Sequence, residues 1–250
     1  RIKACRQQVL LFAGESIAGI DRSRCIGCMK CAAVCPSEAV RAWGEKMSLD
    51  EVMAVIEKDR AFYEKSGGGV TVSGGEPLVQ KDFTRSILKA CCETGIHTCL
   101  ESTFCTDWET VEAAAEYADL LISDIKHMDS EIHKEYTGAG NEKILANLKR
   151  LAACGHDMIL RIPVIPGIND DTENIIKTAD YIEDNIGDRL RVLQLLSFMR
   201  MGEEKCSSLG RTYEMDSLEF DREKFQQRVE DIAAYFNSRR IHCTVGTAQS

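Results

Sequence analysis

The chain has 250 residues, 44% of them hydrophobic and 28% charged, as in an ordinary globular protein with one large domain and a small appendage. Asp and Glu outnumber Lys and Arg by 40 to 31, and the net charge of −9 argues against a nucleic-acid or anionic-membrane partner. No apolar run is long enough to span a membrane and no signal peptide opens the chain, so we expect a cytoplasmic protein.

The first informative segment is rich in cysteine. Twelve cysteines without a secretory signal indicate metal or redox chemistry rather than a disulfide scaffold. Four of them have the bacterial iron–sulfur spacing C-x2-C-x2-C-x3-C followed by proline: Cys25, Cys28, Cys31 and Cys35. A structural zinc site is the alternative, although it usually pairs two C-x2–4-C knuckles across a longer spacer.

A second cysteine segment, residues 4–10, looks like a degenerate copy of residues 34–40. In paired clusters the fourth cysteine ligates the other cluster. This comparison predicts one complete [4Fe–4S] cluster, held by Cys5, Cys25, Cys28 and Cys31. Cys35 would then belong to a second cluster whose other ligands precede Arg1, so residues 1–45 are predicted to be an incomplete ferredoxin-like segment.

The remaining singly or doubly placed cysteines lie within apolar segments, and we expect them to be small buried hydrophobic residues. These are Cys91, Cys92, Cys99, Cys154, Cys206 and Cys243. No role can be assigned to Cys105 from the sequence.

Residues 46–250 alternate between helical and strand-like segments. A capping box, Ser48-Leu-Asp-Glu51, opens a helix that runs to about residue 65, and a second box, Thr106-Asp-Trp-Glu109, opens another. Further helices are expected over residues 81–94, up to about 153, 172–185 and 221–237. Strands are expected over residues 70–73, 97–102, 120–126, 158–165 and 191–198, with a short apolar run at 242–245.

Strict alternation of this kind predicts right-handed βαβ units and a parallel sheet, hence the α/β class. We predict a partial (β/α)6 barrel of the TIM type, whose first strand is missing because it lies upstream of Arg1. A doubly wound open sheet is the alternative.

Unusual polar residues lie at the carboxyl ends of these strands, where α/β proteins place their active sites. They are Gly74, Gly75, Glu76, Glu101, Asp124, Lys126 and Arg161. The glycines could form only a turn, Asp124 and Lys126 only a buried ion pair, and Arg161 only its counter-ion. Together they favour a site for a zwitterion such as an amino acid or an amino-acid-like cofactor.

Four segments of the chain resemble the radical S-adenosylmethionine activating enzymes of glycyl radical enzymes, of which the pyruvate formate-lyase activating enzyme is a familiar member. They are residues 66–78, 95–101, 124–127 and 162–170. The cysteine-rich start resembles members with a ferredoxin-like insertion, such as the activators of glycerol dehydratase, hydroxyphenylacetate decarboxylase and choline lyase.

The resemblance implies roles for the polar residues. Gly74, Gly75 and Glu76 match the segment that holds the amino group of S-adenosylmethionine. Asp124 and Lys126 match residues that contact the same cofactor, and Arg161 matches a site arginine. Glu101 occupies the place of an acidic residue near the cofactor carboxylate and a bound cation.

The chain departs from the family pattern at two places. Met199 stands where the family has a histidine that contacts the cofactor. The CxxxCxxC loop that holds the catalytic cluster does not occur in these residues, and we expect it upstream of Arg1.

The resemblance therefore implies an oxidoreductase that cleaves S-adenosylmethionine reductively and abstracts a hydrogen atom from a glycine of a partner glycyl radical enzyme. It implies [4Fe–4S] clusters, S-adenosylmethionine and a flavodoxin or ferredoxin-type electron donor. Two alternatives remain: an electron-transfer module on an inactive barrel, and a radical enzyme that acts on a small molecule.

Overall fold

The computed structural model describes residues 5–200, 202–213, 215 and 217–246. The chain divides into two compact units, one of Arg1–Met47 and Met199–Glu219, the other of Ser48–Phe198 and Phe220–Ser250. The first unit thus includes a late segment that the sequence-based division into residues 1–45 and 46–250 assigned to the barrel. None of the helices described is both long and apolar enough to cross a membrane.

The first unit is small and contains little regular structure. Strands β1 (Leu10–Ala13) and β2 (Ser16–Ile20) form an antiparallel hairpin around Gly14, whose φ of 63° suits the tight turn. Two short helices complete it, α1 (Lys30–Ala33) and α9 (Glu203–Ser208). The ferredoxin-like character predicted for this segment stays a prediction.

The second unit is built on a parallel sheet whose strands are paired in chain order. These are β3 (Gly69–Val72), β4 (His97–Glu101), β5 (Leu120–Asp124), β6 (Met158–Val164), β7 (Leu190–Ser197) and β8 (Cys243–Val245). The α/β class and the parallel sheet are confirmed. Because the order never reverses, the doubly wound alternative is wrong, and the arrangement is that of a partial barrel.

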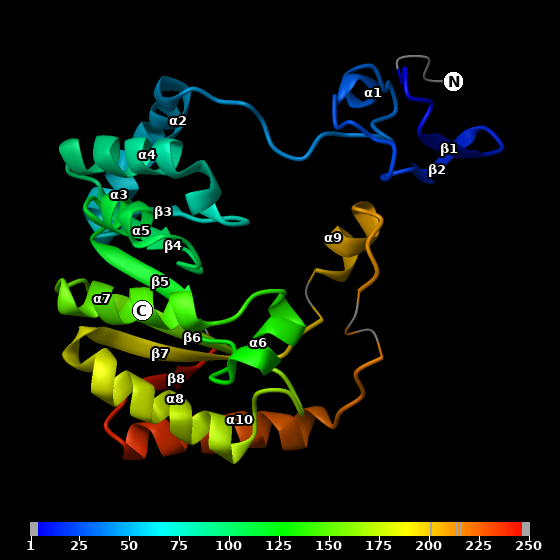
Figure 1. The fold of residues 1–250 in the computed structure, drawn as a ribbon. Helices are drawn as coiled ribbons and strands as arrows, with labels where there is room; N and C mark the ends of the chain where they lie inside the picture. The colour runs from blue at the N-terminus through cyan, green and yellow to red at the C-terminus, as the bar shows by residue number, and fades with distance from the viewer. Residues whose placement is uncertain (1–4, 201, 214, 216, 247–250) are drawn as a thin grey trace. The chain divides into compact units, whose positions relative to one another are not determined.

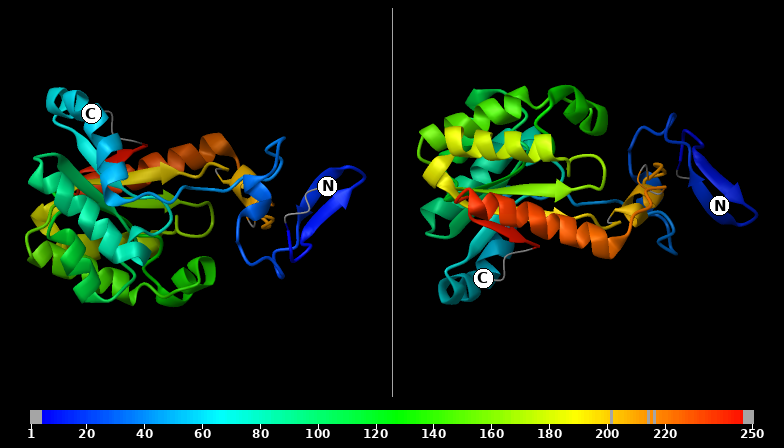
Figure 2. Two further views of the ribbon diagram at one scale, coloured as in Figure 1. Left: turned by 90° about the horizontal axis from the view of Figure 1, so that it is seen from above. Right: turned by 90° about the horizontal axis from the view of Figure 1, so that it is seen from below.

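Helices cover one face of this sheet (Figures 1 and 2). They are α4 (Lys81–Glu93), α5 (Trp108–Ala115), α7 (Glu142–Ala153), α8 (Thr172–Asn185) and α10 (Arg222–Ser238). The shorter elements are α2 (Leu49–Ile56), η1 (Glu57–Asp59), α3 (Arg60–Ser66), η2 (Pro77–Gln80), α6 (Ser130–Thr137) and η3 (Gly187–Arg189). Alternate strand residues such as Leu100, Leu121 and Leu160 are fully buried in the main core, so the other set of alternate residues occupies the opposite face.

The two predicted capping boxes have different outcomes. Ser48 and Glu51 form the predicted reciprocal pair at the start of α2. The second box is wrong, because α5 begins after Asp107 and has no side-chain cap. The Asp107 carboxylate instead accepts from Lys143 Nζ at 2.9 Å.

The predicted burial of the isolated cysteines is half right. Cys91, Cys99 and Cys243 are buried, and burial raises the pKa of Cys99 to about 11 and that of Cys243 to about 12. The prediction is wrong for three others, because Cys92 and Cys154 are exposed and Cys206 is only half-buried.

Candidate cofactor site

A row of polar side chains crosses the face of the sheet opposite the helices. The strand register places Asp124 opposite Arg161, Arg161 opposite Gln194, and Gln194 opposite Thr244. Residues in register on parallel neighbours point to the same face. Strands β5 to β8 therefore present one continuous polar row, and the sequence-predicted residues Asp124 and Arg161 lie side by side in it.

Arg161 is the centre of this row. Its Nε donates to Gln194 Oε1 at 3.0 Å and its Nη1 donates to Glu101 Oε1 at 2.9 Å. Gln194 is 6% exposed and was missed in the sequence. The available signal was a polar side chain between the apolar residues 192–193 and 195–196 of the strand.

The charged residues pair differently from one sequence-based alternative. Lys126 Nζ donates to Asp124 Oδ2 at 2.6 Å, whereas Arg161 is the counter-ion of Glu101 and not of Asp124. Each carboxylate stays accessible, with 32% of the Asp124 side chain and 40% of the Glu101 side chain exposed. Both signs of charge are thus accessible at the carboxyl ends of neighbouring strands, which suits a zwitterionic ligand.

The turn after β3 leaves its backbone open. Gly74 and Gly75 have φ values of 93° and 34°, in the region that favours glycine. A Cβ at either position would meet nothing within 4 Å. Glycine is therefore needed here for backbone conformation, and a ligand can approach the main chain without a side chain in the way.

Glu76 ties this turn to the loop that follows β4. Its carboxylate accepts four hydrogen bonds, from Leu78 N at 3.0 Å, Ser102 Oγ at 2.7 Å, Thr103 N at 2.9 Å and Thr103 Oγ1 at 2.6 Å. Desolvation raises the pKa of Glu76, but these hydroxyl and backbone donors outweigh it and leave the pKa below its ordinary value. Glu76 is therefore ionised and shapes the site.

The loop after β4 is itself held in a constrained conformation. Phe104 is fully buried with a φ of 53°, which is unusual for a residue with a side chain. Asn147 from α7 donates its amide to Phe104 O at 2.8 Å and Thr106 O at 2.9 Å. Sequence reasoning missed Ser102, Thr103 and Asn147, because nothing local indicates that they converge on this loop.

The predicted iron–sulfur ligands lie in the first unit. Cys28 is exposed, and Cys5, Cys25, Cys31 and Cys35 are half-buried. Over residues 5–200, 202–213, 215 and 217–246, no three or more His, Cys, Asp or Glu side chains are gathered closely enough to hold a metal ion. Thiols are the donors that such clusters require, but they are not assembled here, so the ligand set stays a prediction.

Cys35 has surroundings that favour the thiolate. A backbone hydrogen bond from Val40 lowers the pKa of Cys35 against the cost of desolvation, and Ser37, whose Oγ is 3.8 Å from the sulfur, adds to the lowering. Met199, which replaces the family histidine, is 66% exposed, and its predicted relation to the cofactor stays a prediction.

The chain matches a known protein family and a known activating enzyme. The family model of the radical SAM superfamily matches residues 22–179. The (2S)-3-sulfopropanediol dehydratase activating enzyme of Klebsiella oxytoca is 50% identical over 248 residues, which cover 99% of this chain and 78% of that protein. The chain belongs to the radical SAM activating enzymes of glycyl radical enzymes.

Two further activating enzymes and one crystal structure are similar to this chain at lower identity. The isethionate sulfite-lyase activating enzyme of Nitratidesulfovibrio vulgaris is 35% identical over 93% of this chain and 75% of its own length. The 4-hydroxyphenylacetate decarboxylase activating enzyme of Clostridioides difficile is 36% identical over 97% of this chain and 76% of its own length. A crystal structure of a domain of the pyruvate-formate lyase-activating enzyme from Bacteroides vulgatus is 31% identical with a TM-score of 0.57, and covers 72% of this chain and 99% of that domain.

Proposed function

We propose that this activating enzyme binds S-adenosylmethionine at the carboxyl ends of β3 to β6. The observation that carries the proposal is the pair of accessible ion pairs, Asp124–Lys126 and Glu101–Arg161, at this end of the sheet. Lys126 and Arg161 would hold the carboxylate of the methionyl part. The open backbone at residues 74–76 would hold its amino group, with Asp124 and Glu101 supplying negative charge nearby.

When bound beside a reduced [4Fe–4S] cluster, S-adenosylmethionine supplies the 5′-deoxyadenosyl radical that takes a hydrogen atom from a glycine of the partner enzyme. The residues of this chain orient the ligand and limit the access of water. Glu76 contributes by fixing the turn at Gly74 and Gly75 against the loop after β4. No residue of the site is required to act as an acid or a base.

We further propose that the catalytic cluster is held by a CxxxCxxC loop upstream of these residues. Cys5, Cys25, Cys28 and Cys31 would hold one accessory cluster, and Cys35 would contribute to another. These would receive electrons from a flavodoxin or ferredoxin-type donor in the cytoplasm. Thiol chemistry and the cysteine spacing support this assignment.

For the partner, we propose a glycyl radical enzyme that acts on a sulfonated or hydroxylated small molecule, with a sulfopropanediol dehydratase as the first candidate. The support is the 50% identity to the activating enzyme of such a dehydratase, against 35% to 38% for the activating enzymes of isethionate sulfite-lyase, 4-hydroxyphenylacetate decarboxylase and choline trimethylamine-lyase.

The test uses the complete protein with its clusters reconstituted anaerobically, S-adenosylmethionine, a strong reductant and a panel of glycyl radical enzymes. We expect 5′-deoxyadenosine and a glycyl doublet in the electron paramagnetic resonance spectrum, strongest with the dehydratase. No 5′-deoxyadenosine would favour an inactive barrel. Its formation without a doublet on any partner would favour a small-molecule substrate.

Arg161→Gln tests the site within the same assay, because it removes a charge that the proposal assigns to the ligand carboxylate. Glu135→Gln is the matched control, since Glu135 is exposed on α6. We expect the first variant to lose cofactor affinity and the second to match the natural protein.

A further inference from the structure

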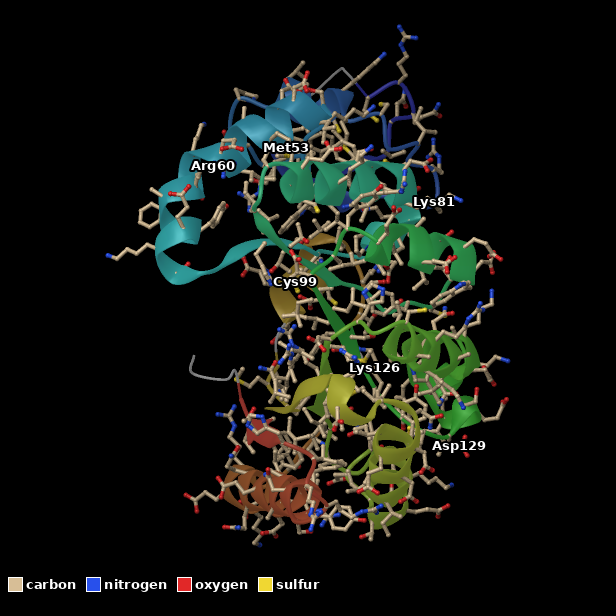
Figure 3. The ribbon with its side chains drawn as sticks, turned by 90° about the vertical axis from the view of Figure 1, so that its left-hand side faces the viewer. Met53, Arg60, Lys81, Cys99, Lys126 and Asp129 are labelled. Atoms are coloured by element: carbon tan, nitrogen blue, oxygen red, sulfur yellow. The ribbon has the colours of Figure 1, made fainter. Side chains whose placement is uncertain are left out.

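The short segment that follows β5 carries Lys126, which is labelled in Figure 3. Three buried asparagines bond to the backbone of this segment. We call this set the asparagine clamp: Asn141, Asn169 and Asn174, with 4%, 2% and 4% exposure. Between them they bond the backbone of three consecutive residues. The bonds are Asn169 Nδ2 to Lys126 O at 2.8 Å, Asn141 Nδ2 to His127 O at 2.8 Å and to Met128 O at 3.0 Å, and Met128 N to Asn174 Oδ1 at 2.8 Å.

Asn169 also joins two strand ends. Its Nδ2 donates to Pro163 O, in β6, at 2.8 Å as well as to Lys126 O, and its Oδ1 accepts from Ile165 N at 2.7 Å. Both amide protons and the amide oxygen are therefore used. The side chain thereby fixes the distance between the carboxyl end of β5 and the carboxyl end of β6.

The clamp is anchored in the helical layer. Asn174 lies in the first turn of α8, and its Nδ2 donates to Asn169 O at 3.0 Å. Asp171 caps the same helix by accepting from Asn174 N at 2.9 Å. A shift of Asn169 would thus break bonds with α8 as well as with both strands.

The Lys126 side chain cannot fix its own position in this way. The Lys126 side chain is 38% exposed, and within the described residues its ammonium makes one ion pair, with Asp124. A long flexible side chain with one partner gains little order from it. The place of the ammonium relative to Arg161 depends instead on where the backbone after β5 is held.

We infer that the asparagine clamp sets the position of Lys126 relative to Arg161, and that Asn169 is a positioning residue of the cofactor site; Asp124 is held directly by the pairing of β5 with β6. The inference rests on the proposed function for the identity of the ligand. The clamp itself touches only backbone groups, and its effect on the ligand is transmitted through them.

The test compares Asn169→Ala with a matched variant at the other end of the sheet. Asn237 also makes three side-chain bonds to backbone, donating to Ala233 O at 2.8 Å and Cys243 O at 2.9 Å and accepting from Cys243 N at 3.1 Å. Two of these bonds are with Cys243, the first residue of β8, and the third is with Ala233 in α10, so all lie away from the carboxyl ends. Asn237 is exposed, whereas Asn169 is buried. Asn237→Ala therefore controls for the loss of three side-chain bonds to backbone outside the cofactor site, at a smaller cost in stability.

We expect Asn169→Ala to weaken the binding of S-adenosylmethionine by the complete, cluster-loaded protein about 10-fold to 100-fold, measured by anaerobic calorimetry. Asn237→Ala should bind as the natural protein does, even if both variants melt at lower temperature. Equal affinity of Asn169→Ala and the natural protein would overturn the inference.

Amide hydrogen exchange on the cofactor-free protein gives an independent readout. We expect faster exchange at the amides of Met128 and Ile165 in Asn169→Ala but not in Asn237→Ala. Unchanged exchange at both amides would overturn the inference that the clamp holds this segment. If the natural protein does not bind S-adenosylmethionine, the proposed function fails. The role of the clamp is then tested by amide hydrogen exchange alone. Should Asn169→Ala not fold, Asn174→Ala is judged by the same criteria.

Discussion

Glu76→Gln tests whether Glu76 stabilises the shape of the cofactor site through its hydrogen bonds to the protein, rather than by contact with a ligand. The carboxylate accepts from Leu78 N and Ser102 Oγ on one oxygen and from Thr103 N and Thr103 Oγ1 on the other. An amide keeps one accepting oxygen. The NH2 group of the glutamine then faces the Thr103 N–H, and this N–H loses its acceptor. The hydrogen bonds that remain are no longer made to a charged group.

The magnitude follows from counting the bonds that change. Hydrogen bonds to a charged group contribute about 1.5 to 3 kcal/mol each, and the lower figure applies because Glu76 is only partly buried. The bond from the Thr103 N–H is lost outright, which gives about 1.5 kcal/mol of destabilisation at neutral pH, and the loss of charge at the other bonds adds to it. The loops after β3 and β4 should separate before the rest of the sheet unfolds, because Glu76 is what joins them.

The pH dependence carries a definite sign. The folded-state pKa of Glu76 is lowered, so its stabilising effect is complete above the unfolded pKa of about 4.3 and is lost as the pH falls through the folded pKa. Urea unfolding from pH 7 to pH 3 should show the natural protein and Glu76→Gln converging in the acid range. Glu135→Gln, on an exposed side chain, corrects for general charge effects. A difference that stayed constant with pH, or no difference at pH 7, would refute the reasoning.

Three further predictions concern single elements of the site. Gly74→Ala should cost about 1 to 2 kcal/mol because its φ of 93° strains a residue with a Cβ, and thermal melting measures this. Arg161→Lys should weaken binding of S-adenosylmethionine in calorimetry, because one ammonium cannot reach both Glu101 and Gln194 as the guanidinium does. Cys5→Ala should lower the iron content of the anaerobically reconstituted protein consisting of residues 1–250 by about one cubane, whereas Cys35→Ala should leave it unchanged, as iron analysis of the purified variants will show.

The periodic elements were predictable because local signals specify them. Helix α8 begins and ends where the sequence indicates, at Thr172 and Asn185, since Asp171 caps it and apolar residues recur at helical spacing. The strands were found to within about two residues, as buried parallel strands are continuous apolar runs. Their consecutive pairing then places Glu101, Asp124 and Arg161 at one end of the sheet.

Partners between distant segments could not be predicted. The sequence offered Asp124 as the counter-ion of Arg161, but Glu101 holds that place because its longer side chain reaches across from β4. The box at 106–109 failed because α5 begins one residue later, with Asp107 rather than Thr106 as its N-cap, and the Asp107 carboxylate pairs with Lys143 from α7. The asparagine clamp had no local signature, because its members are separated by up to 33 positions and meet only after folding.

These differences point to a division of roles at the carboxyl ends of the strands. Side chains that are to bind a ligand must stay partly exposed, as Lys126 and Glu101 do, and exposure leaves them poorly ordered. Order must then come from groups that are buried and fully hydrogen-bonded, which describes Asn169. Such groups contact backbone rather than ligand, so substituting them should change affinity through geometry while every charge of the site remains. For this reason the clamp variants should alter the hydrogen exchange of backbone amides before any ligand is added. Arg161→Lys should leave that exchange unchanged and lower only the affinity for the ligand.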